Sequence, residues 1–131
     1  MHVMDIAPRV SGEAVDLDRH RIAGLMADLG EAASQRMMRR VLGEISDRLA
    51  RAEDAVRGGN MSALRKSAAR IVVLADQVGL SGLAHIAHDV THLADAGPDA
   101  LPARAACAAR LRRVGDASVH ALWEFRDDAC G

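Results

Sequence analysis

The segment from Asn60 to Gly79 constrains the fold most, because it reads as one helix with a defined start and end. Asparagine is favoured at the start of helices, and glycine at the position that follows their last turn. With about 100° of rotation per residue, one side of this helix is continuously apolar or small. The predicted core positions are Leu64, Ser67, Ala68, Ile71, Leu74, Ala75 and Val78. A helix with such a stripe must pack against other elements of the chain.

Two valines, Val72 and Val73, lie outside that stripe, on the opposite side of the helix with Ala69. An exposed apolar patch rimmed by charge is typical of an interaction site. The predicted partner-binding surface, called the valine face below, consists of Arg65, Lys66, Ala69, Val72, Val73 and Asp76. Three occupants remain open for it: the N-terminal part of this chain, a second copy of the chain, or another protein.

Other amphipathic segments flank this helix and predict an all-α fold in a single domain, residues 16–128. Residues 1–15 form a leader that is loose or packed along the domain. A short helix capped by Asp16 or Asp18 precedes Gly30, and longer helices cover 31–57, 81–96 and 101–127. The short Gly58-Gly59 connection makes its two helices antiparallel neighbours. We therefore expect an up-down-up-down four-helix bundle with a short accessory N-terminal helix.

Several local contacts follow from the same periodicity. Ser81 is expected to cap the helix that it begins. In the helix over 31–57, Glu44 with Arg48 and Asp47 with Arg51 are expected to pair at a spacing of four residues. In the last helix, the residues expected to run along the core are Ala105, Ala106, Ala109, Val114, Leu122 and Phe125. Gly115 in that helix predicts a kink or a close contact.

Composition narrows the class of function. The chain has 131 residues, a net charge of −1, and 2% aromatic residues. Nucleic-acid binding is disfavoured, because it normally requires a basic surface and stacking aromatic rings. The sequence has no apolar run long enough to span a membrane and no signal peptide, so we expect a cytoplasmic protein without membrane contact.

Histidines give the most conspicuous chemical pattern, at positions 85, 88 and 92. Imidazoles spaced by three and four residues share a helix face and can bind a transition metal. However, His85, His88 and His92 lie opposite the core stripe that contains Leu83, so a solvated polar face is the preferred interpretation. There is no phosphate-binding loop and no nucleophile with a paired base. We therefore expect a protein that is not an enzyme and has no cofactor or metal, with the histidine site kept as an alternative.

The layout resembles the histidine-containing phosphotransfer (Hpt) domain of bacterial phosphorelays, over about residues 16–125. Leu29-Gly30 resembles the end of that family's first helix, and the segment 55–60 resembles its step into the central helix. Ala68 to Gly79, followed by Leu83-Ala84, resembles the family's motif around the phosphorylated histidine. The resemblance implies a four-helix bundle with an accessory N-terminal helix.

By the same resemblance, Ala69 occupies the position of the phosphorylated histidine, so no catalytic residue is present. Val72 and Val73 stand where the family has its lysine and glycine. The resemblance thus implies a non-catalytic, pseudo-phosphotransfer signalling domain that acts by protein–protein contact in or near a two-component phosphorelay. Its partner would be a response-regulator receiver domain or a histidine kinase. The alternatives are a structural homodimerising bundle and, less favoured, a metal-binding bundle.

Overall fold

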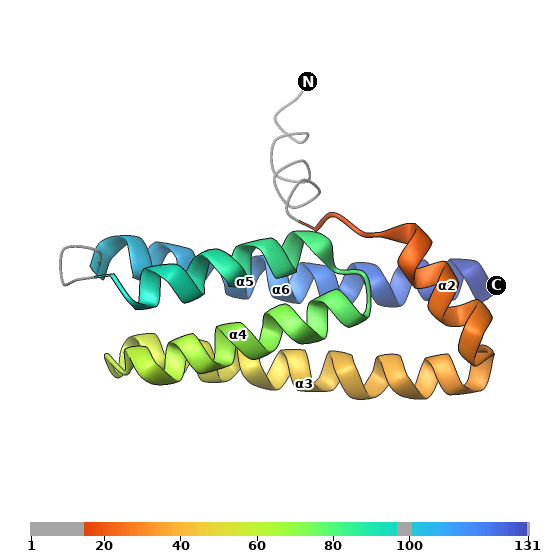
Figure 1. Cartoon of the computed structure of the whole chain (residues 1–131), viewed down its shortest axis with the longest axis horizontal. Helices are drawn as coiled ribbons and strands as arrows, with labels where there is room; N and C mark the ends of the chain where they lie inside the picture. The colour runs from red at the N-terminus through yellow and green to blue at the C-terminus, as the bar shows by residue number, and fades with distance from the viewer. Residues whose placement is uncertain (1–14, 97–100, 131) are drawn as a thin grey trace, which may run out of the picture.

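The computed structural model of the chain describes residues 15–96 and 101–130, and these residues form helices joined by short connections (Figure 1). The helices are α2 (Arg19–Leu29), α3 (Glu31–Arg57), α4 (Met61–Gln77), α5 (Ser81–Ala94) and α6 (Leu101–Cys130). No strand occurs in the part of the chain described, and the predicted all-helical class is confirmed. Residues 1–14 of the predicted leader lie outside the described residues.

The four long helices run alongside one another, and α2 crosses one end of them (Figure 1). Each long helix packs on two others: α3 on α4 and α6, and α5 on α4 and α6, while α2 contacts α3. The interior is aliphatic, as the scarcity of aromatic residues requires. Its largest fully buried side chains include Met38, Ile45, Leu49, Leu64, Ile71, Leu83, Leu111 and Leu122. This packing fixes which side of α4 faces outward.

The two predicted ends of α4 are confirmed. The Asn60 side-chain oxygen accepts a hydrogen bond from the Ala63 amide at 3.0 Å, which satisfies one of the free amides of the first turn. Gly79 follows the helix with φ of +77°, in the left-handed region that glycine adopts without a steric penalty. All seven residues of the predicted core stripe are buried. The opposite side of α4 therefore faces outward.

The turn after α4 is held by the segment that precedes α2. The Asp18 amide donates to the Gly79 carbonyl at 2.8 Å, and the Asp18 carboxylate caps α2 by accepting from the Arg21 amide at 3.0 Å. The prediction that Ser81 caps α5 is wrong, since Leu80 occupies that position and makes no side-chain cap. The Ser81 hydroxyl instead donates to the Asp16 carbonyl at 3.0 Å, because that segment lies against the start of α5.

Helix α6 buries Val114 and Leu122 as predicted, but its first turns face differently from what was expected. Ala105, Ala106 and Ala109 are exposed, so their prediction as core residues is wrong. The buried positions recur at intervals of three and four and include two polar residues: Arg104, Ala108, Leu111, Val114, Ser118 and Leu122. An alanine-rich helix gives little contrast between its sides, which explains the misplaced face. The close contact predicted at Gly115 is confirmed, because a β-carbon there would lie 2.4 Å from a Leu49 methyl group.

Candidate functional site

The outward side of α4 presents an apolar centre. The Val73 side chain is 49% exposed, and Ala69, one turn earlier, is also exposed. Val72 is partly buried and packs against the core cluster, so it forms one edge of the patch. Among the described residues, Leu29 is the other exposed large hydrophobic side chain. Val73 is half exposed with α2 in place, so the first helix does not cover it.

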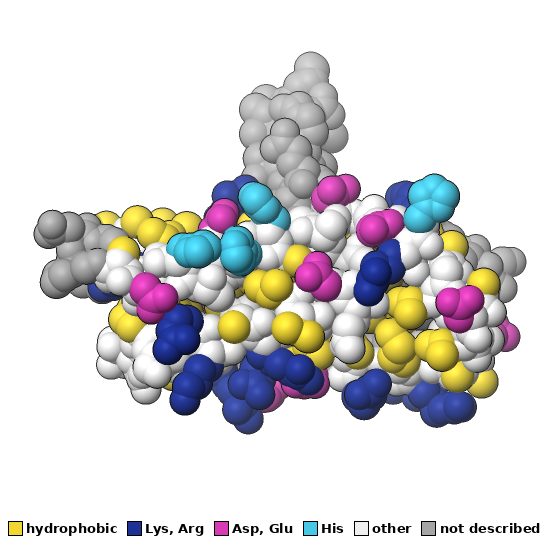
Figure 2. Space-filling model, in the orientation of Figure 1, with side chains coloured by type: hydrophobic (Ala, Val, Ile, Leu, Met, Phe, Trp, Pro, Cys, Tyr) yellow, Lys and Arg dark blue, Asp and Glu magenta, His cyan; other side chains and the backbone are white. Residues whose placement is uncertain are grey.

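Charged residues surround this centre. The Arg65 guanidinium pairs with the carboxylate of Asp95, the residue directly after α5, at 3.3 Å. Asp76 is exposed on the last turn of α4 and lines a small cleft of about 280 Å³ together with Arg21 of α2. Figure 2 shows this side of the molecule: hydrophobic side chains lie between lysines and arginines along the α3 and α4 edge and histidines near α5. The valine face thus has the rim of charge that the sequence predicts.

On the α3 side of the face, Arg70 pairs with Glu44 of the neighbouring helix. The Arg70 Nε and Nη2 atoms donate to the two Glu44 carboxylate oxygens at 2.7 and 3.2 Å. This hydrogen bond lowers the pKa of Glu44 and raises that of Arg70. The predicted attraction between Glu44 and Arg48 is present, since the Arg48 charge also contributes to the lowered pKa of Glu44, but the hydrogen bonds of Glu44 go to Arg70. The predicted Asp47–Arg51 pair is confirmed at 3.1 Å.

Next to Lys66 lies an open groove of about 570 Å³ between the end of α3 and the start of α4. Its charged lining residues are Arg48, Arg51, Asp54 and Lys66, and its small ones include Ala55, Ala63 and Ser67. The sequence prediction included Lys66 but missed the two arginines. Both lie off the core stripe of α3, and antiparallel pairing of the α3–α4 hairpin brings them opposite Lys66. The sequence does contain a signal for these two arginines: aligning the two predicted antiparallel helices residue by residue places both opposite Lys66.

The three histidines of α5 are exposed, as predicted, but do not converge on one point. The Nε2 atoms of His88 and His92 lie 3.1 Å apart, with their rings perpendicular. The His85 Nε2 atom instead lies 4.0 Å from the Asp89 carboxylate. Within residues 15–96 and 101–130, no group of three or more metal-binding side chains is positioned to hold an ion.

The centre of the valine face consists of side chains without a nucleophilic atom. At its centre are the Ala69 methyl group and the Val73 isopropyl group, neither of which can accept a phosphoryl group or a proton. Removing the apolar centre from water is favourable, and the surrounding charges can orient a molecule that covers it. This surface is therefore suited to contact with another molecule.

Comparison with known proteins yields no relative. No family model matches the chain, and no curated protein or solved structure matches it. In the part of the chain that the structure describes, no helix has the length and apolar character needed to cross a membrane.

Proposed function

We propose that the chain is an up-down-up-down four-helix bundle of the Hpt type, with α2 as its accessory helix. In this proposal it is a pseudo-phosphotransfer signalling domain of the cytoplasm that acts by protein–protein contact. The valine face of α4 binds the partner, which is a receiver domain or a histidine kinase of a two-component phosphorelay. Ala69 takes the place of the phosphorylated histidine, so the contact occurs without phosphoryl transfer.

The observation that carries this proposal is the half-exposed Val73 at the centre of a charged rim. Covering a valine of this kind stabilises a complex through apolar burial, by roughly 25 cal/mol for each Å² removed from water. The order of packing, α3 against α4, α4 against α5 and α5 against α6, is the order expected for the Hpt layout. The resemblance of the 55–84 segment supplies the class of partner.

Val73→Asp is expected to weaken receiver binding by at least about tenfold, because it buries an unpaired carboxylate at the centre of the contact. The measurement is a pull-down with a panel of receiver domains, followed by a titration of those retained. Because Val73 is half exposed, the variant should keep the fold, which circular dichroism checks.

The matched control is Ala106→Asp, which adds the same charge at an exposed position on α6. It should bind as the unmodified chain does. The proposal fails if no receiver domain or kinase is retained, or if both aspartate variants bind equally well.

A homodimer through the valine face is the second candidate. It is favoured by the mixed charge of the rim, where Lys66 and Asp76 would face each other across a two-fold axis. Sedimentation at high protein concentration separates the two candidates. A dimer that Val73→Asp dissociates supports this one, whereas a monomer excludes it.

A further inference from the structure

The groove between α3 and α4 has an excess of positive charge. Three cations line it, from Arg48, Arg51 and Lys66, against the single carboxylate of Asp54. Lys66 makes no hydrogen bond or ion pair with any described residue. Arg51 has a partner in Asp47, but both side chains of that pair are more than half exposed. Such an exposed pair contributes little and is readily exchanged.

Arg48 makes no close ion pair with a described carboxylate, although its charge contributes to the lowered pKa of Glu44. Its expected partner, Glu44, is held by Arg70 through two hydrogen bonds. The Arg48 Nε atom is buried and, among the described residues, has no hydrogen-bond partner. A buried donor without an acceptor costs free energy, so the described residues satisfy this guanidinium only in part.

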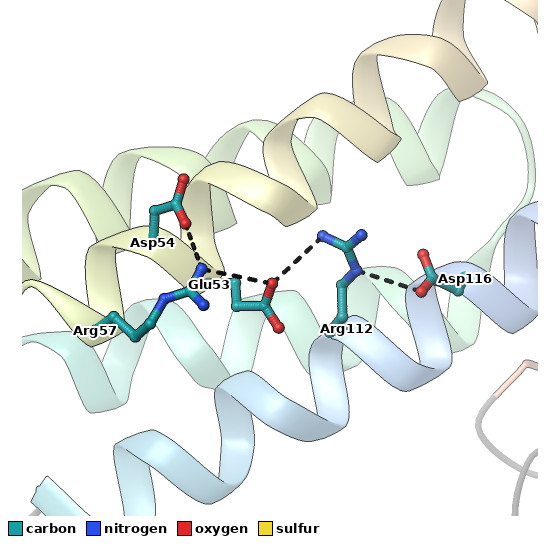
Figure 3. Close-up of polar contacts among 5 residues, drawn as sticks. All are labelled: Glu53, Asp54, Arg57, Arg112 and Asp116. Carbon is teal, nitrogen blue, oxygen red and sulfur yellow. Dashed lines mark hydrogen bonds and ion pairs between the residues drawn. The ribbon is translucent and has the colours of Figure 1, made fainter.

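The acidic residues at the end of α3 are also engaged elsewhere. Figure 3 shows Arg57 between Asp54 and Glu53, and Arg112 of α6 between Glu53 and Asp116. Asp54, the one carboxylate lining the groove, is thus already paired with Arg57. Glu53 is directed toward α6. The described acidic residues therefore compensate the cations of the groove only in part: Arg51 has its exposed pair with Asp47, and Lys66 has no ion-pair partner among them.

We propose that this groove binds an acidic segment of a protein partner, with carboxylates facing Arg48, Arg51 and Lys66. Ala55 and Ala63 leave the groove shallow and partly apolar, which suits an extended or helical peptide with apolar residues between its acids. Lys66 belongs to both the groove and the valine face, so one partner can occupy both surfaces. The inference rests on the proposed function for the identity of that partner.

The charge of the whole chain favours an acidic protein segment over a nucleic-acid strand as the ligand of the groove. The net charge is −1, so the positive potential is local to the groove. The chain has no tyrosine, one phenylalanine and one tryptophan, none of which lines the groove to stack with bases. A short acidic peptide matches a local site, whereas a nucleic-acid strand needs a continuous basic track.

The probe is a peptide of alternating Glu-Glu and Leu-Ala pairs. It is titrated into the full chain, and binding is measured by NMR from the amide chemical shifts of the chain. A Lys-for-Glu version of the peptide and inorganic phosphate are added in parallel. We expect the acidic peptide to shift the amides of residues 48–51 and 63–67. Raising salt from about 0.05 M to about 0.3 M should weaken the binding, since these charges are partly exposed.

Arg48→Gln combined with Lys66→Gln is expected to weaken peptide binding by roughly tenfold. The matched control, Arg39→Gln combined with Arg113→Gln, removes the same charge at exposed positions of α3 and α6. It should leave binding unchanged. Equal loss in both double variants, or equal shifts with the basic peptide, would overturn the inference.

Shifts from phosphate without shifts from the acidic peptide would also overturn it, in favour of a small-anion site. The Val73→Asp variant separates this inference from the proposed function. It should still bind the acidic peptide while losing the receiver domain. The double variant Arg48→Gln with Lys66→Gln tests whether one partner occupies both surfaces. If it loses the peptide but binds the receiver domain unchanged, the two surfaces serve different ligands, and the shared partner is contradicted.

Discussion

Gly79→Ala is expected to destabilise the fold by about 2–4 kcal/mol, because two costs add at this residue. Its φ of +77° disfavours any residue with a β-carbon. The added carbon would also lie 2.9 Å from the Ile22 Cγ1 atom and 3.0 Å from the Asp18 carbonyl oxygen. The carbonyl belongs to the backbone and the Ile22 side chain is fully buried, so neither moves without disturbing α2.

Gly59→Ala is the matched control for that experiment. Gly59 has a similar φ of +69°, but nothing lies within 4 Å of the position that its β-carbon would occupy. It should cost only the backbone strain, about 1 kcal/mol. The two variants are compared by urea unfolding, and hydrogen exchange over residues 18–29 should increase in Gly79→Ala alone. Equal losses of stability would show that the contact of α2 with this turn contributes nothing.

Gly115→Val is expected to destabilise the fold by about 1–3 kcal/mol, because it overpacks the contact between α6 and α3. A β-carbon at this position would lie within 2.4–3.1 Å of three Leu49 side-chain atoms. Leu49 is 1% exposed, so it is enclosed by other core residues and cannot move out into solvent. Leu49→Ala alone should cost about 2–5 kcal/mol through the cavity that it leaves.

The double variant tests whether the two residues occupy the same space. Gly115→Val with Leu49→Ala should lose clearly less stability than the sum of the single variants, since the valine fills part of the cavity. The control is Gly43→Val, at an exposed glycine inside α3 with nothing within 4 Å. That change should be neutral or stabilising, because valine has a higher helix propensity than glycine. Additive losses would contradict the close approach of α3 and α6.

The sequence was most informative where periodicity and end signals agree. Asn60 and Gly79 mark the ends of α4, and its core stripe is buried as predicted, because leucine, isoleucine and valine give a strong contrast between the two sides. Helix α6 lacks that contrast. Its exposed alanines resemble core residues, while Arg104 is buried with its Nη1 atom donating to the Ala96 carbonyl at 2.6 Å. The burial of this arginine depends on a hydrogen bond to another segment, which the pattern of its own helix does not reveal.

The candidate site was predictable in its centre and less so at its edges. The outward position of Val73 follows from the rotation of one helix. The ion pairs of the charged rim do not follow from that rotation, because they depend on which helices are neighbours. Arg65 pairs with Asp95, directly after α5, and Arg70 pairs with Glu44 of α3. The groove at Lys66 depends on the register of α3 against α4 for the same reason. Contacts between elements thus fix what a single helical wheel leaves open.

The most direct test of the central proposal, contact without phosphoryl transfer, uses a receiver domain that the chain retains. The receiver is phosphorylated on its aspartate with labelled phosphate and mixed with the unmodified chain. Complex formation is read on a native gel, and acid-labile label on the chain is read after denaturation. The proposal predicts a complex with no label on the chain, because the Ala69 side chain has no nitrogen that could accept the phosphoryl group. Acid-labile label on the chain, or no complex with any receiver domain or kinase, would contradict it.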